Sequence, residues 1–314
     1  KFKLNFNSNT THLTSKSTYW NYKKFINKSN DSLSELTNKL DFLLSNTIEQ
    51  QLNTDVNNGC FLSGGIDSSL ITAIASKVSK KKLITISVGF SNSDFDESFY
   101  AAKIADYLKT EHYTKVVDME NISKIIKVLP DIYGEPYADS SQIPTSLLCQ
   151  FASTKIKVAL AGDGADEFFG GYDRYSFVPR FWKILRVLPL SARILIKQLL
   201  NLLKPFSYKF ITFIIQKLLN KYTNTLYFES KLSNLINALD SNSPVDFAKK
   251  LSIHFYKNFG IVLFTNFKDK SYNFDDNLSY IENIMLNDTI DYLPNDLLVK
   301  TDRASMYFGL EARM

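Results

Sequence analysis

The chain has 314 residues, and its 37 Lys and Arg against 32 Asp and Glu give a formal net charge of +5. Hydrophobic residues make up 45% and charged residues 22%, which excludes a disordered, collagen-like or disulfide-scaffolded chain. Such a mild charge does not by itself require a nucleic acid or a membrane surface as partner. The length allows one large domain or two smaller ones.

The N-terminal region predicts one strand and one helix. Phe2, Leu4 and Phe6 alternate with polar residues, as in a β-strand. Asp31 or Ser32 can cap a helix that runs to about residue 51, because leucines recur there on one face.

Residues 56–161 alternate between strand and helix patterns, which predicts βαβ units. We therefore expect an α/β fold with a mostly parallel, doubly wound sheet and an appended helical subdomain. The predicted strands are 56–62, 83–90, 112–117 and 157–161, and the predicted helices are 68–77, 96–108, 121–129 and 143–153.

The segment 180–221 contains cations and apolar residues but no Asp or Glu. Its pattern predicts amphipathic helices broken at Pro189 and Pro205, and cations interrupt it too often for a membrane span. We interpret it as a packed helical subdomain with a basic face; a membrane-surface or partner-binding face is the alternative. Residues 291–314 are expected to be helical again, up to the last residue.

A glycine-rich turn, Ser63-Gly64-Gly65-Ile66-Asp67-Ser68-Ser69, joins the strand at 56–62 to the next helix. Unpaired N–H groups at a helix start, glycines and hydroxyls together favour an anion site. Asp67 fits such a site if a Mg²⁺ bridges its carboxylate to phosphate. The plain alternative is a tight turn with a Ser or Asp N-cap.

Three carboxylates, Asp163, Asp166 and Glu167, follow the strand at 157–161 and lie among glycines. Open α/β sheets bind ligands at this edge, whereas the alternative is a solvated acidic loop. Cys60 and Cys149 are too few and too far apart to frame a secreted fold, which favours a reducing, cytoplasmic location. We expect Cys60 to be a small buried hydrophobe.

Four motifs together resemble the synthetase domain of glutamine-hydrolysing asparagine synthetases, in the N-type ATP pyrophosphatase (PP-loop) superfamily. They are the turn at 63–69, Gly134-Glu135-Pro136-Tyr137-Ala138-Asp139, the acidic glycine-rich run at 161–172, and the segment at 296–306 with Gly309-Leu310-Glu311-Ala312-Arg313. The resemblance covers residues 56–175 and 290–314, and it implies a sheet of the adenine nucleotide alpha hydrolase type.

The resemblance implies ATP and Mg²⁺ as cofactors and ATP-dependent amidation of L-aspartate to L-asparagine through β-aspartyl-AMP. It places nucleotide contacts on one set of residues, an acyl-adenylate role on Asp163, where many relatives have Glu, and Mg²⁺ on Asp67 and Asp166. The nucleotide contacts are Leu62, Ser63, Gly64, Gly65, Asp67, Ser68, Val88 and Gly162. Arg303, Glu311 and Arg313 are expected to form an ion-pair network that closes the site, unless they form an ordinary helix-surface network.

The resemblance also predicts the domain organisation. Residues 1–25 correspond to the remnant and linker of an N-terminal glutaminase domain, 26–178 to the ATP-binding core, and 179–314 to the helical part. The chain starts at Lys1 without the N-terminal Cys of a glutaminase and ends before the family's downstream catalytic Lys. We therefore expect an internal fragment of low activity alone, whose ammonia comes from glutamine in a domain absent here.

Several alternatives remain open. A related PP-loop enzyme could amidate or cyclise another carboxylate, and a non-catalytic relative could bind ATP or act as a scaffold. We expect no nucleic-acid partner. Salt-sensitive RNA binding by the basic segment 180–221 would support the contrary hypothesis of a nucleic-acid role. We expect no transmembrane segment, and a homodimer is compatible with the sequence.

Overall fold

A computed structural model describes residues 2–7, 10–16, 26, 29–90, 96–202, 225–252 and 274–314. The chain divides into two compact units, Lys1–Thr47 and Ile48–Met314. In the first unit, β1 (Phe2–Asn7) and β2 (Thr10–Lys16) form an antiparallel hairpin. The predicted strand is confirmed, and β2 was not anticipated.

Helix α1 (Leu33–Leu52) begins where Ser32 caps it. The Ser32 Oγ accepts from the N–H of Glu35 at 3.3 Å, and Glu35 Oε2 accepts from the N–H of Ser32 at 2.8 Å. This reciprocal pair satisfies donors that the first helical turn would leave free, which confirms the predicted start.

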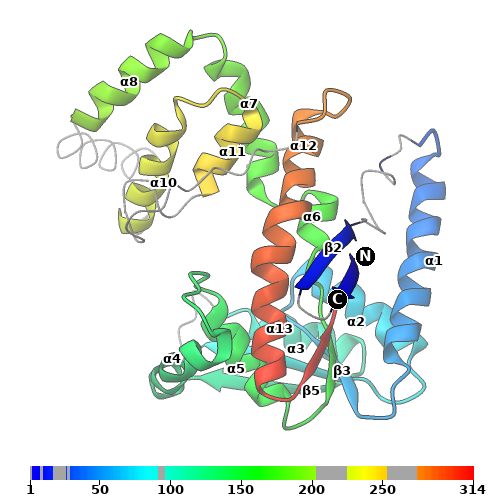
Figure 1. The fold of residues 1–314 in the computed structure, drawn as a ribbon. Coiled ribbons are helices and arrows are strands. Elements are labelled where there is room, and N and C mark those ends of the chain that lie inside the picture. The colour runs from blue at the N-terminus through cyan, green and yellow to red at the C-terminus, as the bar shows by residue number, and fades with distance from the viewer. Residues whose placement is uncertain are drawn as a thin grey trace. The chain divides into compact units, whose positions relative to one another are not determined.

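The second unit contains a five-stranded parallel sheet with the order β5-β4-β3-β6-β7. Figure 1 labels two of its strands, β3 and β5. The sheet therefore confirms the predicted α/β fold and all four strands predicted within 56–161. Its strands are β3 (Asn58–Phe61), β4 (Ile84–Phe90), β5 (Glu111–Val117), β6 (Val158–Leu160) and β7 (Glu311–Arg313).

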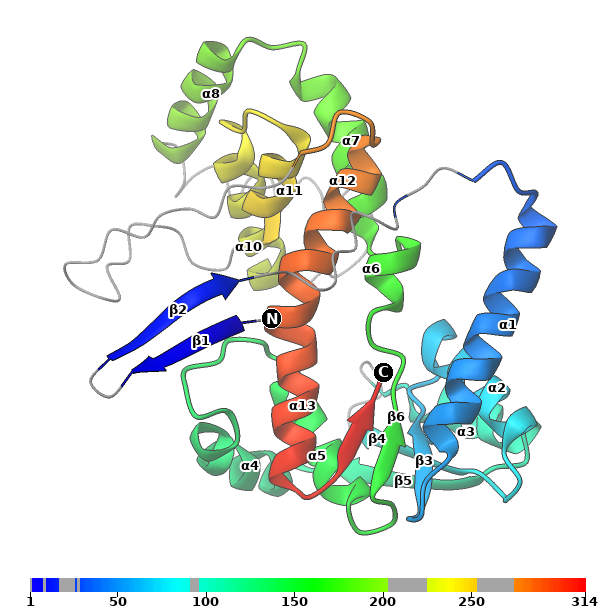
Figure 2. The same cartoon turned by 45° about the vertical axis from the view of Figure 1, so that its right-hand side comes forward.

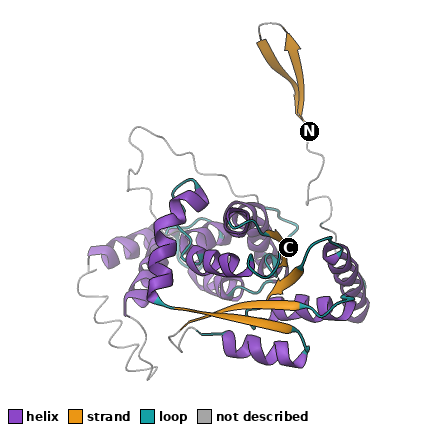
Figure 3. Ribbon diagram, turned by 90° about the horizontal axis from the view of Figure 1, so that it is seen from below, coloured by secondary structure: helices purple, strands orange, loops and turns teal. Residues whose placement is uncertain are grey.

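Helices cover both sides of this sheet, as Figure 3 shows. On one side α2 (Ile66–Val78) and α3 (Ser98–Tyr107) contact β3, β4 and β5. On the other side α5 (Gln142–Ala152) packs on β4 and β5, and α4 (Met119–Tyr133) and α13 (Leu298–Tyr307) pack on α5. Doubly wound packing of this kind buries both faces of the central strands, so β3 and β6 are almost wholly buried. The outer strand β5 is mostly exposed or half-buried.

The strand order fixes where a ligand can enter. From β3 the chain moves outward to β4 and β5 and then returns to β6 on the opposite side of β3. The chain therefore leaves β3 and β6 toward opposite ends of the sheet, although the two strands end side by side at its carboxyl edge. In open α/β sheets this switch point is the usual ligand crevice.

The expected helix up to residue 314 is wrong, because α13 ends at Tyr307 and residues 311–313 form the edge strand β7. The N–H of Glu311 donates to Lys157 O at 2.9 Å, and the N–H of Ala161 donates to Arg313 O at 2.8 Å. These hydrogen bonds to β6 and its flanking residues, about 150 residues earlier in the chain, take the place of the backbone hydrogen bonds that a continuing helix would form.

A helical subdomain with its own apolar core is confirmed. It contains α7 (Asp173–Leu185), α8 (Leu190–Leu202), α10 (Thr225–Ala238), α11 (Pro244–Ser252) and α12 (Tyr280–Asn287). The π-helical segment η3 (Asp288–Leu297) continues α12 into α13, so one column of helix runs from the subdomain core to the sheet (Figure 2). The buried core residues are Tyr175, Val178, Trp182, Leu185, Ala238, Val245, Phe247, Ala248 and Ile284.

Two cations of the predicted basic face have internal partners instead. Arg193 is buried, donates to the carbonyls of Leu239 and Ser241, and lies over the ring of Trp182. Lys197 pairs with Asp240 at 2.6 Å. Helix α8 starts directly after Pro189, as predicted, whereas Pro205 lies outside the described residues.

Among the described helices, none combines the length and the apolar character that crossing a membrane requires.

Candidate active site

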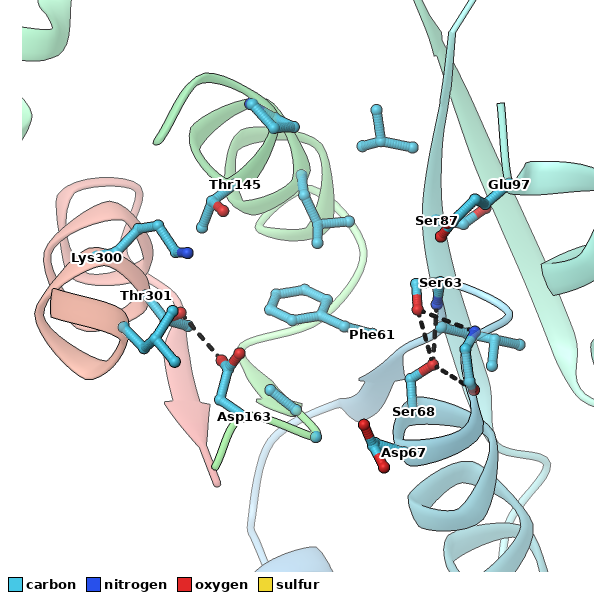
Figure 4. A pocket seen from close by; sticks show the side chains of 18 of the residues that line it. Phe61, Ser63, Asp67, Ser68, Ser87, Glu97, Thr145, Asp163, Lys300 and Thr301 are labelled. Atoms are coloured by element: carbon cyan, nitrogen blue, oxygen red, sulfur yellow. Dashed lines mark hydrogen bonds between the residues drawn. The ribbon is translucent and has the colours of Figure 1, made fainter. Parts of the chain in front are cut away.

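A cavity of about 450 Å³ opens at the switch point of the sheet. It lies beyond the carboxyl ends of β3, β4 and β6 and is bounded on the far side by α5 and α13 (Figure 4). All predicted site residues except Gly64 line it: Leu62, Ser63, Gly65, Asp67, Ser68, Val88, Gly162, Asp163 and Asp166.

One wall of the cavity, here called the loop wall, consists of Ser63, Gly65, Asp67 and Ser68. Helix α2 starts after Gly65 without any side-chain cap. The hydroxyls bond to nearby groups of the same turn: Ser68 Oγ accepts from the N–H of Ser63 at 3.2 Å and lies 3.0 Å from Ser63 Oγ. An uncapped helix start with flanking hydroxyls is a ready anion site.

Two glycines explain how this wall is built. Gly64 has a φ of +89°, and a Cβ there would lie 2.8 Å from Tyr100 Cβ and 2.9 Å from the backbone N of Ala101. Gly64 thus permits the turn and its packing on α3 and does not line the cavity. At Gly162 a Cβ would lie 3.1 Å from the backbone N of Ser68, so this glycine lets the turn after β6 approach the start of α2.

The carboxylates Asp67 and Asp166 lie where those two turns meet. Burial raises the pKa of Asp67, and the charge of Asp166 raises it further. Two carboxylates that repel each other at an anion site fit a divalent cation, since Mg²⁺ takes one or two carboxylates and completes its shell with phosphate and water. Among the described residues no group of three or more His, Cys, Asp or Glu side chains could hold a metal ion.

The opposite wall, here called the helix wall, consists of Asp163, Lys300 and Thr301 (Figure 4). Asp139 and Ser141 contact Lys300 and are counted with this wall. Lys300 Nζ lies 2.8 Å from Asp139 Oδ2 and 2.7 Å from Ser141 Oγ, and both ends of the ion pair are largely buried. Lys300 and the hydrogen bonds from Ser141 lower the pKa of Asp139 against the effect of its burial.

Asp163 is held by α13. Its Oδ2 accepts a hydrogen bond from Thr301 Oγ1 at 3.0 Å. Burial raises the pKa of Asp163, while the Thr301 bond and the charge of Lys300 oppose that rise. A carboxyl group whose pKa is raised in this way holds a proton more readily than an exposed aspartate, which suits an acid–base role.

Glu167, on the short helix α6 (Ala165–Phe169), also lines the cavity and is 1% exposed. Its Oε1 accepts from the hydroxyl of Tyr172 at 2.6 Å. Its Oε2 has no hydrogen-bond partner among the described residues. Burial raises the pKa of this carboxyl, and the bond from Tyr172 opposes that rise.

The remaining lining between β3, β4 and α5 is largely apolar. Val88 and Leu62 lie here with Phe61, Phe90 and Leu148. The N–H of Leu62 donates to Ile86 O at 2.9 Å, so a nucleotide contact through the Leu62 backbone would fall to its carbonyl. A flat aromatic base suits such a slot, whereas Glu97 at its mouth is exposed.

The expected network of Arg303, Glu311 and Arg313 is corrected to two separate pairs. Arg303 pairs with Glu135 at 2.8 Å and donates to the carbonyl of Tyr133. Arg313 pairs with Glu311 at 2.8 Å on the edge strand. The strand conformation of residues 311–313 separates them from the helix that carries Arg303.

The sequence reasoning missed the roles of Lys300, Thr301 and Tyr172. All three occur within motifs that the resemblance used, but the pattern alone did not show which side chains face the cavity. Cys60, in contrast, is fully buried as predicted, and burial raises the pKa of its thiol to about 12.

The fold and the cavity define a class: an open, parallel α/β protein with an uncapped helix start at the switch point of its sheet. Residues 39–314 match the asparagine synthase family, and the chain belongs to that family.

Three curated relatives illustrate the range of similarity. The putative glutamine-hydrolysing asparagine synthetase 2 of Methanocaldococcus jannaschii is 34% identical over 166 residues, 51% of this chain and 32% of that protein. Asparagine synthetase 1 of Bacillus subtilis is 38% identical over 129 residues, covering 41% of this chain and 20% of that protein. The Homo sapiens asparagine synthetase is 30% identical over 154 residues, covering 45% of this chain and 27% of that protein.

The chain thus spans about a third or less of the length of these relatives. A solved structure of an NH3-dependent NAD synthetase from Campylobacter jejuni is 18% identical, covers 43% of this chain and 60% of its own, and has a TM-score of 0.32. That similarity is too low to bear on fold or function.

Proposed function

We propose that this chain carries the synthetase half of an ATP-dependent asparagine synthesis, in which L-aspartate is activated as β-aspartyl-AMP. The observation that carries the proposal is the meeting of an uncapped helix start, a pair of repelling carboxylates and the half-buried Asp163 in one cavity. Membership of the asparagine synthase family supports the same reading.

In the first step, an oxygen of the aspartate side-chain carboxylate attacks the α-phosphorus of ATP. The bond from that phosphorus to the bridging oxygen breaks, and pyrophosphate leaves with the electron pair. The backbone N–H groups at the start of α2 and the hydroxyls of Ser63 and Ser68 would hold the departing phosphates. Asp67 and Asp166 would hold a Mg²⁺, which supplies charge neutralisation on the phosphates when bound.

In the second step, ammonia attacks the acyl carbon and AMP leaves. The nitrogen then carries a surplus proton, which Asp163 is placed to accept because its buried carboxyl holds protons more readily than an exposed one. Thr301 would orient that carboxylate through its 3.0 Å hydrogen bond. We further propose that ammonia comes from glutamine in a separate domain, as the names of the relatives indicate for those proteins.

The test is pyrophosphate release from Mg-ATP by the chain supplied with ammonium salts, with L-aspartate compared against a panel of other carboxylic acids. The proposal expects release that depends on aspartate and is accompanied by equal amounts of AMP and asparagine. Release driven better by another acid would favour a related amidating or cyclising enzyme. If Mg-ATP fails to raise the Tm, the nucleotide-binding part of the proposal fails as well.

A further inference from the structure

Glu167 is more deeply buried than the carboxylates of Asp139 and Asp163, and it differs from Asp139 in its hydrogen bonding. Asp139 uses both oxygens, one toward Lys300 and one toward Ser141. Glu167 is 1% exposed, uses Oε1 for Tyr172, and leaves Oε2 without a partner among the described residues. Buried polar atoms in folded proteins are nearly always paired, so an unpaired buried carboxylate oxygen at a cavity indicates a missing donor.

The charge of the cavity indicates what kind of donor is missing. Five carboxylates line it, whereas Lys300 is the one cationic side chain among the described lining residues and is already paired with Asp139. An acid and a triphosphate that enter such a cavity need compensating positive charge. A metal ion held by Asp67 and Asp166 would neutralise the negative charge of those two carboxylates but not the charge of Glu167. The lining carboxylates are Asp67, Glu97, Asp163, Asp166 and Glu167.

We propose that Glu167 receives the ammonium group of the acid substrate and thereby restricts adenylation to amino acids. This inference rests on the proposed function. A single free carboxylate oxygen suits one N–H donor of an ammonium group, and such charge-assisted bonds are among the strongest. Rotation about the last side-chain torsion of glutamate is soft and moves both carboxylate oxygens together. A small rotation can therefore bring the almost enclosed Oε2 toward a ligand while the Tyr172 hydroxyl follows Oε1.

The test compares two acids that differ in one group. L-aspartate and succinate have the same four-carbon skeleton and the same two carboxylates, but only aspartate carries an ammonium group. Their Kd values are measured by calorimetry on the full chain saturated with magnesium and a non-hydrolysable ATP analogue. The wild-type chain should bind aspartate about ten- to a hundredfold more tightly than succinate, as one charge-assisted hydrogen bond implies.

In Glu167→Gln this preference should fall to about threefold or less, while the Kd of succinate changes by less than about twofold. Glu97→Gln removes a charge from the exposed mouth of the same cavity and should leave the preference unchanged. Tyr172→Phe retains the Glu167 charge and should retain the preference for aspartate. The preference is a ratio within one variant, so it stays measurable even if a substitution lowers the folded fraction.

Equal weakening of both acids in Glu167→Gln would overturn the proposal and make Glu167 a structural residue. An increase of succinate binding by ammonium chloride, in the wild type but not in Glu167→Gln, would also overturn it, because Glu167 would then serve the incoming nitrogen. If neither acid binds the nucleotide-loaded chain and no pyrophosphate is released, the proposed function itself has failed.

Discussion

The loop wall and the helix wall of the cavity satisfy their polar groups in opposite ways. In the helix wall, Lys300 is matched by Asp139, and Asp163 is held by Thr301. In the loop wall, the start of α2 lacks a side-chain cap, and the charge of Asp166 raises the pKa of Asp67. The difference teaches that the helix wall pairs its charged groups without a ligand, whereas the loop wall leaves a helix start uncapped and two carboxylates in repulsion. The proposed nucleotide and Mg²⁺ would compensate these two features.

The largest loss of activity is expected from substitution of Asp163, the carboxylate of the helix wall that lines the cavity. Asp163→Ala should lower steady-state pyrophosphate release in the presence of aspartate and ammonia by about 10²- to 10⁴-fold, the range for loss of an acid–base group. Without the proton acceptor of the second step, the enzyme cannot complete a turnover and start the next one. Mg-ATP affinity should stay within about twofold, because the loop wall is intact. Release is followed by a coupled phosphate assay and affinity by calorimetry. Thr301→Val keeps the carboxylate and should cost much less; an unimpaired Asp163→Ala enzyme would remove this residue from the mechanism.

Breaking the ion pair of the helix wall should mainly cost stability. Lys300→Met leaves the carboxylate of Asp139 buried without its cation, which should lower the free energy of unfolding by about 3–5 kcal/mol. Urea unfolding measures the change. Lys124→Met is the matched control, since its pair with Glu120 is exposed and should contribute less than about 1 kcal/mol. Equal losses in the two variants would mean that the Lys300–Asp139 pair contributes no more to the free energy of unfolding than an exposed ion pair does.

A substitution in the loop wall should raise the stability of the ligand-free protein, whereas Lys300→Met in the helix wall should lower it. Asp67→Asn should weaken Mg-dependent ATP binding by about ten- to a hundredfold. Without ligand, however, the variant should be slightly more stable at neutral pH.

The reason lies in the pKa of Asp67, which is higher in the folded protein than in the unfolded chain. The folded state therefore binds this proton more tightly, and the wild type loses stability as the pH rises from the ordinary aspartate pKa through the raised one. The Tm advantage of Asp67→Asn should grow over that pH window and vanish below it. A variant that is less stable than the wild type at every pH would contradict this account.

The smallest effect is expected from a hydroxyl of the same wall. Ser68→Ala removes the acceptor for the Ser63 N–H and should weaken Mg-ATP binding about fivefold, equivalent to about 1 kcal/mol. Ser76→Ala removes a similar hydroxyl far along α2, where it bonds to the carbonyl of Ala73, and should leave binding unchanged. A fivefold loss in both variants would point to a general effect on the helix.

Much of this fold could be predicted because its signals are local. Alternating strands and helices within residues 56–161 gave the sheet, and the turn at Ser63 sits at its switch point as expected. The edge strand β7 could not be predicted, because a strand of three residues acquires its structure from β6 rather than from its own pattern. The Lys300–Asp139 pair could not be predicted for the same reason: its members are 161 residues apart in the chain, and a local pattern does not show such contacts.

The assignment of individual site residues remains a prediction, although the cavity collects nearly all of them. The resemblance supplied the carboxylates of the 161–172 run as a group. It could not show that Asp163 contacts α13 while Glu167 is buried beside Tyr172, because the two roles depend on which way the turn after β6 directs each side chain.

The pairing of β6 with β7 has a consequence for biosynthesis. On the ribosome, β6 emerges roughly 150 residues before β7, the strand that pairs with its open edge. Asp139 and Asp163 likewise emerge well before α13, the helix that supplies their partners Lys300 and Thr301. During that interval a sheet formed by the nascent chain would expose the unpaired backbone groups of β6 and would contain Asp139 without Lys300, and such exposed edges favour aggregation. Quality control of this protein should therefore depend on how quickly translation passes from residue 160 to residue 313.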